Sequence, residues 1–213
     1  MTQTTCLLIG CPVDSGKRRP GCLMGPDAYR TAGLAEELAT LGHAVEDLGN
    51  LSPDPHQPDT GDGRLFKPNL TAAWTESLTR AAIEAMPRGL PIFLGGDHAL
   101  SLGTVAGAAA HAASVGRPLF VLWLDAHSDI HTPDTTETGH LHGTPIAYVT
   151  GRPGFEAFPP VPHPVAEENV CYIGLRSVDP AERKLLEQSR IHRYDMRQID
   201  EHGIARPLAG FLD

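Results

Sequence analysis

The sequence predicts an α/β fold built on a mostly parallel sheet. Short apolar runs alternate with longer stretches of helical periodicity, the pattern of strands joined by helical crossovers. One run, LFVLWL at residues 119–124, is apolar throughout, as expected for a strand buried on both faces of a parallel sheet. The 213 residues are enough for one domain with a sizeable core. We therefore expect a single domain over residues 1–213.

The predicted elements follow one another in a regular order. The expected strands are CLLIG, AVEDL, LPIFL, LFVLWL, CYIGL and HRYD, at residues 6–10, 44–48, 90–94, 119–124, 171–175 and 192–195. The expected helices cover residues 26–41, 70–85, 99–113, 180–188 and roughly 200–212. The first of these helices has Pro26 near its start and Gly42 after its end, where each residue is favoured. Residues 49–69 are rich in proline and aspartate and are expected to form a long loop.

Composition argues against several classes of function. The formal net charge of −9 disfavours nucleic acid and anionic membranes as partners. The longest apolar run, residues 118–124, is too short to cross a bilayer, and the N-terminus shows no secretory signal. We expect a cytoplasmic protein whose four cysteines are reduced packing residues. They are Cys6, Cys11, Cys22 and Cys171.

Polar residues follow two of the expected strands, where ligands of open α/β sheets bind. Strand 90–94 runs into GGDH, and strand 119–124 runs into DAHSD, whose polar residues alternate along one face of an extended segment. The two imidazoles and two carboxylates form a nitrogen and oxygen ligand set that suits Mn²⁺, and also Fe, Co or Ni. The alternative is that these side chains only cap helices and pair with backbone. The candidate ligands are His98, Asp125, His127 and Asp129.

LGGDHAL (94–100) and WLDAHSDIHTP (123–133) resemble two signature motifs of the ureohydrolases, the arginase and agmatinase family. GCPVDSG, GPDAYRTAGL, TGHLHGTP and YIGLRSVDPAE extend the resemblance over essentially the whole chain. The resemblance implies a three-layer α/β/α fold and a centre that holds two Mn²⁺ ions. It also implies hydrolysis of a guanidino group to urea and an amine.

The same resemblance implies roles for individual residues. His98, Asp125, His127 and Asp129 would be metal ligands, with Asp125 bridging the two ions. Asp129 would also hydrogen-bond the metal-bridging hydroxide that attacks the substrate. His142 would shuttle protons to the amine leaving group, a task that suits imidazole near neutral pH. Asp97 would either orient His98 or cap the following helix.

Two further segments resemble the clamp with which arginases hold an amino acid. In the first, the hydroxyls of Thr136 and Thr138 would donate to the substrate carboxylate. In the second, the turn from Asp179 to Glu182 would hold the ammonium group. Because agmatine has no carboxylate, the expected reaction is manganese-dependent hydrolysis of L-arginine to L-ornithine and urea.

The sequence departs from the family pattern in two respects. His131 and His140 stand where many arginases carry asparagine; each can still donate a hydrogen bond, but strict L-arginine specificity is less firmly implied. The family's third motif, S-x-D-x-D-x-x-D-P, does not occur, so the C-terminal strands and two further ligands are missing from this chain. We expect this polypeptide by itself to be inactive or nearly so, and an exposed sheet edge to favour a homo-oligomer.

Two alternative functions stay open. The protein could hydrolyse another guanidino compound, such as agmatine or guanidinobutyrate, or it could be a catalytically inactive metal-binding fragment. Nucleotide binding is excluded at the loop from Gly10 to Lys17, because its spacing does not match the phosphate-loop pattern. Neither a G-x-G-x-x-G motif after a strand nor a G-x-S-x-G elbow is present.

Overall fold

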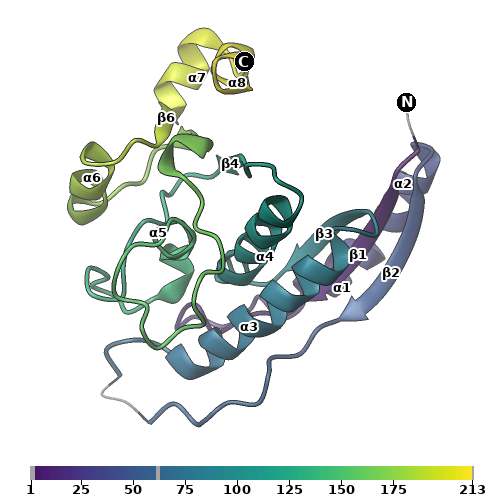
Figure 1. The fold of residues 1–213 in the computed structure, drawn as a ribbon, viewed down its shortest axis with the longest axis horizontal. Helices are drawn as coiled ribbons and strands as arrows, with labels where there is room; N and C mark the ends of the chain where they lie inside the picture. Colours follow the sequence, from purple (N-terminus) through teal and green to yellow (C-terminus); the bar gives the residue numbers. More distant parts are fainter. Residues whose placement is uncertain (1–2, 61–62, 213) are drawn as a thin grey trace.

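A computed structural model describes residues 3–60 and 63–212. Residues 1–2, 61–62 and Asp213 belong to the predicted domain but lie outside the described residues. In the described chain, six strands form two three-stranded sheets in which every strand pair is parallel (Figure 1). Parallel sheets flanked by helices confirm the predicted α/β class and its three-layer arrangement.

The first sheet has the order β2-β1-β3 and the second has the order β4-β5-β6. The strands are β1 (Thr5–Cys11), β2 (Ala44–Asn50), β3 (Leu90–Gly95), β4 (Val121–Leu124), β5 (Val170–Leu175) and β6 (His192–Asp195). The longer helices are α3 (Pro68–Ala85) and α4 (Leu100–Ser114). The shorter ones are α1 (Gly25–Thr31), α2 (Leu34–Thr40), α5 (Pro145–Val149), α6 (Pro180–Glu187), α7 (Met196–His202) and α8 (Ala205–Leu212), with single 3₁₀ turns at Leu141–Gly143 and Glu167–Asn169.

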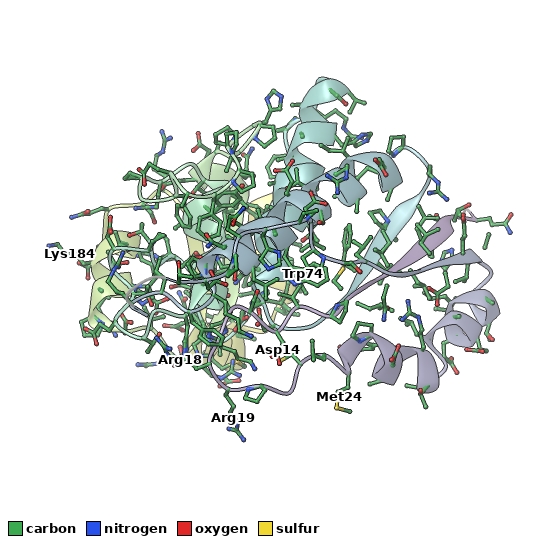
Figure 2. All side chains as sticks on the ribbon, turned by 90° about the horizontal axis from the view of Figure 1, so that it is seen from below. Asp14, Arg18, Arg19, Met24, Trp74 and Lys184 are labelled. Atoms are coloured by element: carbon green, nitrogen blue, oxygen red, sulfur yellow. The ribbon has the colours of Figure 1, made fainter. Side chains whose placement is uncertain are left out.

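The core lies between the first sheet, the α3–α4 pair and the inner face of β4. Trp74 of α3 lies within it, whereas Met24 points outward at the surface (Figure 2). Leu7, Leu8 and Ile9 of β1 are almost fully buried, as expected for a central strand. Helices α3 and α4 approach closely because α4 carries Gly103, where a Cβ atom would lie 2.5 Å from the carbonyl oxygen of Thr75. This packing fixes α4, whose preceding loop carries His98.

The structure shows the burial of the four cysteines, and the length and apolar character of the helices. Cys6, Cys11 and Cys171 are buried, half-buried Cys22 is less enclosed, and all four are free thiols. No helix within the described residues combines the length and apolar character that a membrane crossing requires.

Two predicted helices are each divided in the structure. The helix expected over residues 26–41 is interrupted by Gly33, whose φ of 84° is left-handed, so α1 and α2 form separately. The stretch expected over residues 200–212 is divided at Gly203, with a φ of 74°. Helix α7 begins earlier than predicted because Asp195 forms a capping box with Gln198.

The prediction that strand 119–124 is buried on both faces is wrong. Val121 and Trp123 are buried, whereas Leu122 is 38% exposed and Leu124 is 67% exposed. A parallel strand is buried on both faces only where other elements cover both sides. In the described chain, the core packs against the face that carries Val121 and Trp123 and leaves the other face partly uncovered.

Candidate functional site

The site forms where the loops after β1, β3 and β4 meet at the carboxyl ends of the strands. The loop after β3 is tied to the loop after β1, because the Asp97 N–H donates to the Val13 carbonyl at 2.8 Å. Gly96 permits this approach, since a Cβ atom there would lie 2.4 Å from the Val13 carbonyl oxygen. The imidazole of His98 stacks on the indole of Trp123, with ring centroids 4.4 Å apart. This contact joins the ends of the two sheets.

Four side chains converge there, and we call them the metal cluster: His98, Asp125, His127 and Asp129. His98 Nδ1 lies 2.8 Å from Asp129 Oδ2 and 3.1 Å from Asp125 Oδ2. The other oxygen of Asp125, Oδ1, lies 3.3 Å from His127 Nδ1. Asp125 therefore stands between the two imidazoles and turns one oxygen toward each.

Asp129 is the most constrained member of the metal cluster. Its side chain is only 8% exposed, and its φ of 47° is unusual for a residue other than glycine. The buried Oδ2 atom makes no aligned hydrogen bond within the described residues, although His98 Nδ1 is close. Burial lowers the pKa of His98, but the carboxylates of Asp129 and Asp125 outweigh burial and raise that pKa above its usual value.

This donor set fits a divalent cation. One ligand atom from each of His98, Asp125 and Asp129 lies within 4.8 Å of the others. A buried carboxylate oxygen without an aligned donor is costly unless another positive partner occupies the space it faces. Imidazole nitrogen combined with carboxylate oxygen suits Mn²⁺ and its neighbours among the transition metals. His127 lies at the open side of the cluster, with 58% of its side chain exposed.

His142 and His140 lie in the 3₁₀ turn at Leu141–Gly143 and just before it. The His142 N–H donates to the Gly16 carbonyl at 3.1 Å, which ties this turn to the loop after β1. Burial lowers the pKa of the half-buried His142 ring. The His140 ring is 5.5 Å from that of His142, and burial also lowers its pKa.

Asp97 contacts backbone rather than the imidazole of His98. Its Oδ1 accepts a hydrogen bond from the Ala99 N–H at 2.9 Å, and its Oδ2 accepts one from the Gly16 N–H at 2.8 Å. The first bond closes a turn just before α4, whose N-cap residue is Ala99 and which has no side-chain cap, so the helix-capping expectation for Asp97 is wrong. The second bond, to Gly16, was not foreseen.

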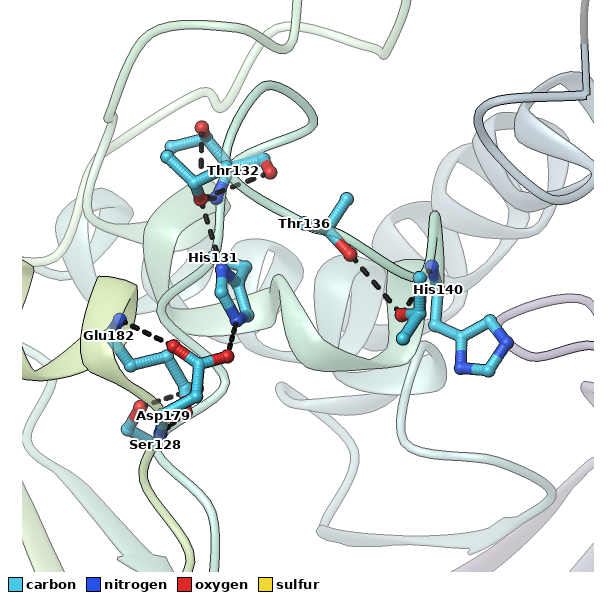
Figure 3. A network of polar contacts seen from close by, with 9 residues as sticks. Ser128, His131, Thr132, Thr136, His140, Asp179 and Glu182 are labelled. Atoms are coloured by element: carbon cyan, nitrogen blue, oxygen red, sulfur yellow. Dashed lines mark hydrogen bonds and ion pairs between the residues drawn. The ribbon is translucent and has the colours of Figure 1, made fainter.

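A second acid–histidine group, which we call the clamp cluster, consists of His131, Asp179 and Glu182 (Figure 3). Asp179 and Glu182 form the capping box of α6, in which the Glu182 N–H donates to Asp179 Oδ1 at 2.9 Å and the Asp179 N–H donates to Glu182 Oε2 at 3.1 Å. His131 Nε2 lies 2.7 Å from Asp179 Oδ2. The Ser128 hydroxyl donates to Glu182 Oε1 at 2.7 Å.

The remaining predicted substrate residues form a separate group around the second half of the same loop (Figure 3). The hydroxyl oxygens of Thr136 and Thr138 are 3.4 Å apart, and the His140 N–H donates to Thr138 Oγ1 at 3.3 Å. His140 Nε2 accepts a bond from the Arg18 N–H at 3.3 Å. The structure therefore divides the predicted clamp residues between two places.

Several residues of the site were missed from the sequence. Trp123 was read only as part of a strand, and Ser128 only as a spacer between ligands. No pattern in the sequence marks either role, because both depend on contacts between distant segments. The capping box at Asp179 could have been found, since aspartate followed three residues later by glutamate is its signature.

The chain was compared with protein families and with known proteins. Residues 4–213 match the family model described as the arginase family. The chain is 51% identical to an arginase of Agrobacterium fabrum over 212 residues, which cover 98% of this chain and 65% of the relative. It is 50% identical to an arginase of Brucella melitensis, covering 98% of this chain and 69% of the relative. It thus spans about two thirds of the length of these relatives.

The fold of the chain is also similar to that of a solved arginase structure. The structure of an arginase from Bacillus caldovelox superposes with a TM-score of 0.86 and 34% sequence identity, covering 99% of this chain and 71% of that one. Sequence, fold and the group of ligand residues at the strand ends agree. The chain belongs to the arginase family.

Proposed function

We propose that the protein hydrolyses L-arginine to L-ornithine and urea with two Mn²⁺ ions held by the metal cluster. The observation that carries this proposal is the convergence of His98, Asp125 and Asp129 around the buried Asp129 Oδ2, which makes no aligned hydrogen bond within the described residues. Membership of the arginase family supports the reaction, because the relatives at about 50% identity are named arginases.

The metal cluster would divide its ligands between two ions. Asp125 turns its two oxygens toward different imidazoles, so it is the residue suited to bridge them. His98 and Asp129 would hold one ion, and His127 would hold the other. When bound, the ions would lower the pKa of a water molecule and supply a bridging hydroxide near neutral pH, a nucleophile strong enough for a resonance-stabilised guanidinium. Asp129 would also accept a hydrogen bond from that nucleophile.

His142 is proposed to move protons between the reaction and solvent. An amine leaves only after it is protonated, and imidazole is suited to that transfer. The lowered pKa keeps His142 neutral near pH 7, so the ring can take up a proton and pass it to the departing amine.

The substrate would be held by the two groups of clamp residues. Thr136 and Thr138 offer hydroxyl donors for the α-carboxylate, together with His140. His131 contacts Thr135 Oγ1 at 3.0 Å and Asp179 Oδ2 at 2.7 Å through its two ring nitrogens, so in place of the predicted contact with substrate we assign it to orienting Asp179. Asp179 is 46% exposed and can accept from the α-ammonium group, although His131 already contacts one of its oxygens. Both carboxylate oxygens of Glu182 accept hydrogen bonds within the protein, so we assign Glu182 to shaping the clamp cluster.

The proposed setting is the cytoplasm, and the proposed partner is a small molecule. A net charge of −9 disfavours nucleic acid and anionic membranes. We also propose a homo-oligomer, supported by the exposed apolar side chains of β4, among which Leu124 is 67% exposed.

The test is urea release by the polypeptide as its native source makes it, identified by intact mass. Protein treated with a chelator is reloaded with Mn²⁺ and given L-arginine, agmatine or guanidinobutyrate. If the intact mass exceeds 22.8 kDa, we expect urea from L-arginine and a much lower kcat/KM for the other two; from the 213 residues alone we expect little or no urea. A preference for a compound without an α-carboxylate would move the proposal to another guanidino substrate. Tight Mn²⁺ binding with no urea from any of them would indicate a metal-binding protein without activity.

A further inference from the structure

We infer that Asp97 is a positioning residue for His142 and acts through the backbone of Gly16. Asp97 Oδ2 accepts the Gly16 N–H at 2.8 Å, and the Gly16 carbonyl accepts the His142 N–H at 3.1 Å. One residue of the loop after β1, through its own N–H and its own carbonyl, thus connects a buried carboxylate to the backbone of the proposed proton shuttle. The expected effect on catalysis rests on the proposed function, whereas the two hydrogen bonds are features of the structure.

The connecting loop is held from several sides. Asp97 is 3% exposed, and Gly16 is buried between it and His142. The Thr71 hydroxyl contacts the Ser15 hydroxyl at 2.9 Å, which anchors the loop to α3. A loop fixed in this way transmits a change at Asp97 to the turn at Leu141–Gly143 instead of absorbing it.

The contact at Gly16 leaves no room for a side chain. A Cβ atom there would lie 2.5 Å from Asp97 Oδ1 and 2.9 Å from His142 Cβ. Both distances are below those that real Cβ contacts show, so an alanine would push the two residues apart. Gly143, which directly follows His142, is different, because a Cβ atom there meets nothing within 4 Å and its φ is not left-handed. The chain therefore offers a matched pair of glycines on the two sides of the shuttle.

The chemistry at Asp97 also favours a role in holding the loop. Its two oxygens serve two N–H donors, at Gly16 and Ala99. An asparagine has one oxygen acceptor and would turn its amide NH₂ toward the other donor. Because an asparagine side chain, like that of aspartate, commonly accepts from the backbone N–H two residues on, Asp97→Asn should keep the bond to Ala99 and lose the bond to Gly16.

The experiment uses the polypeptide as its native source makes it and measures kcat, KM for L-arginine and Mn²⁺ affinity for Gly16→Ala, Asp97→Asn, Gly143→Ala and His142→Ala. We expect kcat to fall about 10- to 100-fold in Gly16→Ala and Asp97→Asn, since a small misplacement of a reacting group has that effect. KM and Mn²⁺ affinity should change less than about 2-fold, and added imidazole should restore part of kcat by carrying protons in place of His142. Gly143→Ala should behave as wild type.

A second readout does not depend on activity. The rate at which diethyl pyrocarbonate modifies His142 is mapped by mass spectrometry, with exposed His163 as an internal reference. His142 should react faster in Gly16→Ala and Asp97→Asn than in Gly143→Ala. If Gly16→Ala does not fold, kcat and the modification rate of His142 are both tested on Asp97→Asn.

The outcomes separate the two proposals. If His142→Ala keeps full kcat, the shuttle assignment in the proposed function fails, while the modification rates still test the positioning role. If His142→Ala loses kcat but Gly16→Ala and Asp97→Asn do not, the inference is overturned. It is also overturned if kcat and Mn²⁺ affinity fall together in Asp97→Asn, because Asp97 would then act through His98.

Discussion

The metal cluster and the clamp cluster have similar composition, but they differ in the hydrogen bonds that their carboxylate oxygens accept from the protein. Each contains three histidine or carboxylate side chains whose ligand atoms lie within 4.8 Å of one another: His98, Asp125 and Asp129 in the metal cluster, and all three members of the clamp cluster. In the clamp cluster, each carboxylate oxygen of Asp179 and Glu182 has a partner within the protein. In the metal cluster, the buried Oδ2 of Asp129 makes no aligned hydrogen bond within the described residues.

The difference shows that closeness of potential ligands does not by itself define a metal site. A carboxylate whose two oxygens already accept from donors of the protein gains less from a cation, because those donors already stabilise its negative charge. A carboxylate that is buried and lacks an aligned donor is stabilised by a cation. On this ground, only the metal cluster should bind Mn²⁺, and the clamp cluster should contribute stability and substrate recognition.

The largest expected effect follows from replacing a carboxylate in each cluster. Asp129→Asn should weaken Mn²⁺ binding at least ~100-fold, since loss of a ligand costs more than the roughly 10- to 100-fold typical of residues that only orient ligands. Asp179→Asn should change the affinity less than about 2-fold. Isothermal titration calorimetry on protein freed of metal measures both. Equal losses in the two variants would mean that both clusters hold metal.

The next effect concerns stability. Glu182→Ala should lower the free energy of unfolding by about 1–3 kcal/mol, because it leaves the Ser128 hydroxyl and the Asp179 N–H without their acceptor. Glu187, an exposed residue of the same helix, provides the control, and Glu187→Ala should lie within about 0.5 kcal/mol of wild type. Urea unfolding of the metal-free protein compares the two. A smaller loss at Glu182 than at Glu187 would contradict the assigned role.

A smaller effect is expected for substrate binding. Thr138→Ala should raise KM for L-arginine about 5- to 10-fold by removing a hydrogen bond to a charged group. KM for agmatine, which has no carboxylate, should hardly change. Steady-state kinetics with both substrates provides the measurement and its control. Equal increases would place Thr138 outside carboxylate recognition.

The smallest expected effect is a pH dependence within the clamp cluster. Burial alone would raise the pKa of Asp179, but the hydrogen bonds from the Glu182 N–H and His131 outweigh it and hold the pKa below its usual value. A carboxyl with a lowered pKa in the folded state stabilises the protein above its unfolded pKa of about 3.9, and the contribution is lost as pH falls below that value.

Asp179→Asn keeps a helix-capping side chain and removes the charge. Its deficit in unfolding free energy should therefore be present at neutral pH and shrink as pH falls below about 4. Urea unfolding of both proteins at neutral and acidic pH measures the deficit. A deficit that stays constant over this range would show that the charge of Asp179 makes no contribution.

The sequence predicted most of the fold because the relevant signals are local. Short apolar runs bounded by loop residues marked five of the six described strands. The sixth, β6, has the predicted bounds His192–Asp195, although its sequence HRYD is mostly polar. The breaks at Gly33 and Gly203 could not be distinguished from tolerated helical glycines, because the left-handed conformation depends on where the next element has to go. The exposure of Leu124 depends on what packs against β4, which no property of the strand itself specifies.

The candidate site divides in the same way. The sequence by itself determined which residue types follow the strands. The expectation that DAHSD is extended is wrong: β4 ends at Leu124, the chain bends over residues 125–127 and Asp129 has a φ of 47°, so bends of the chain and not side-chain alternation bring these ligands together. Only the tertiary structure decided that Asp97 bonds to Gly16, 81 residues earlier in the chain, and that Trp123 stacks on His98. It also decided which carboxylate oxygens already accept hydrogen bonds from the protein. Tertiary packing determines which distant segments become hydrogen-bond partners, so a pattern along the sequence does not predict them.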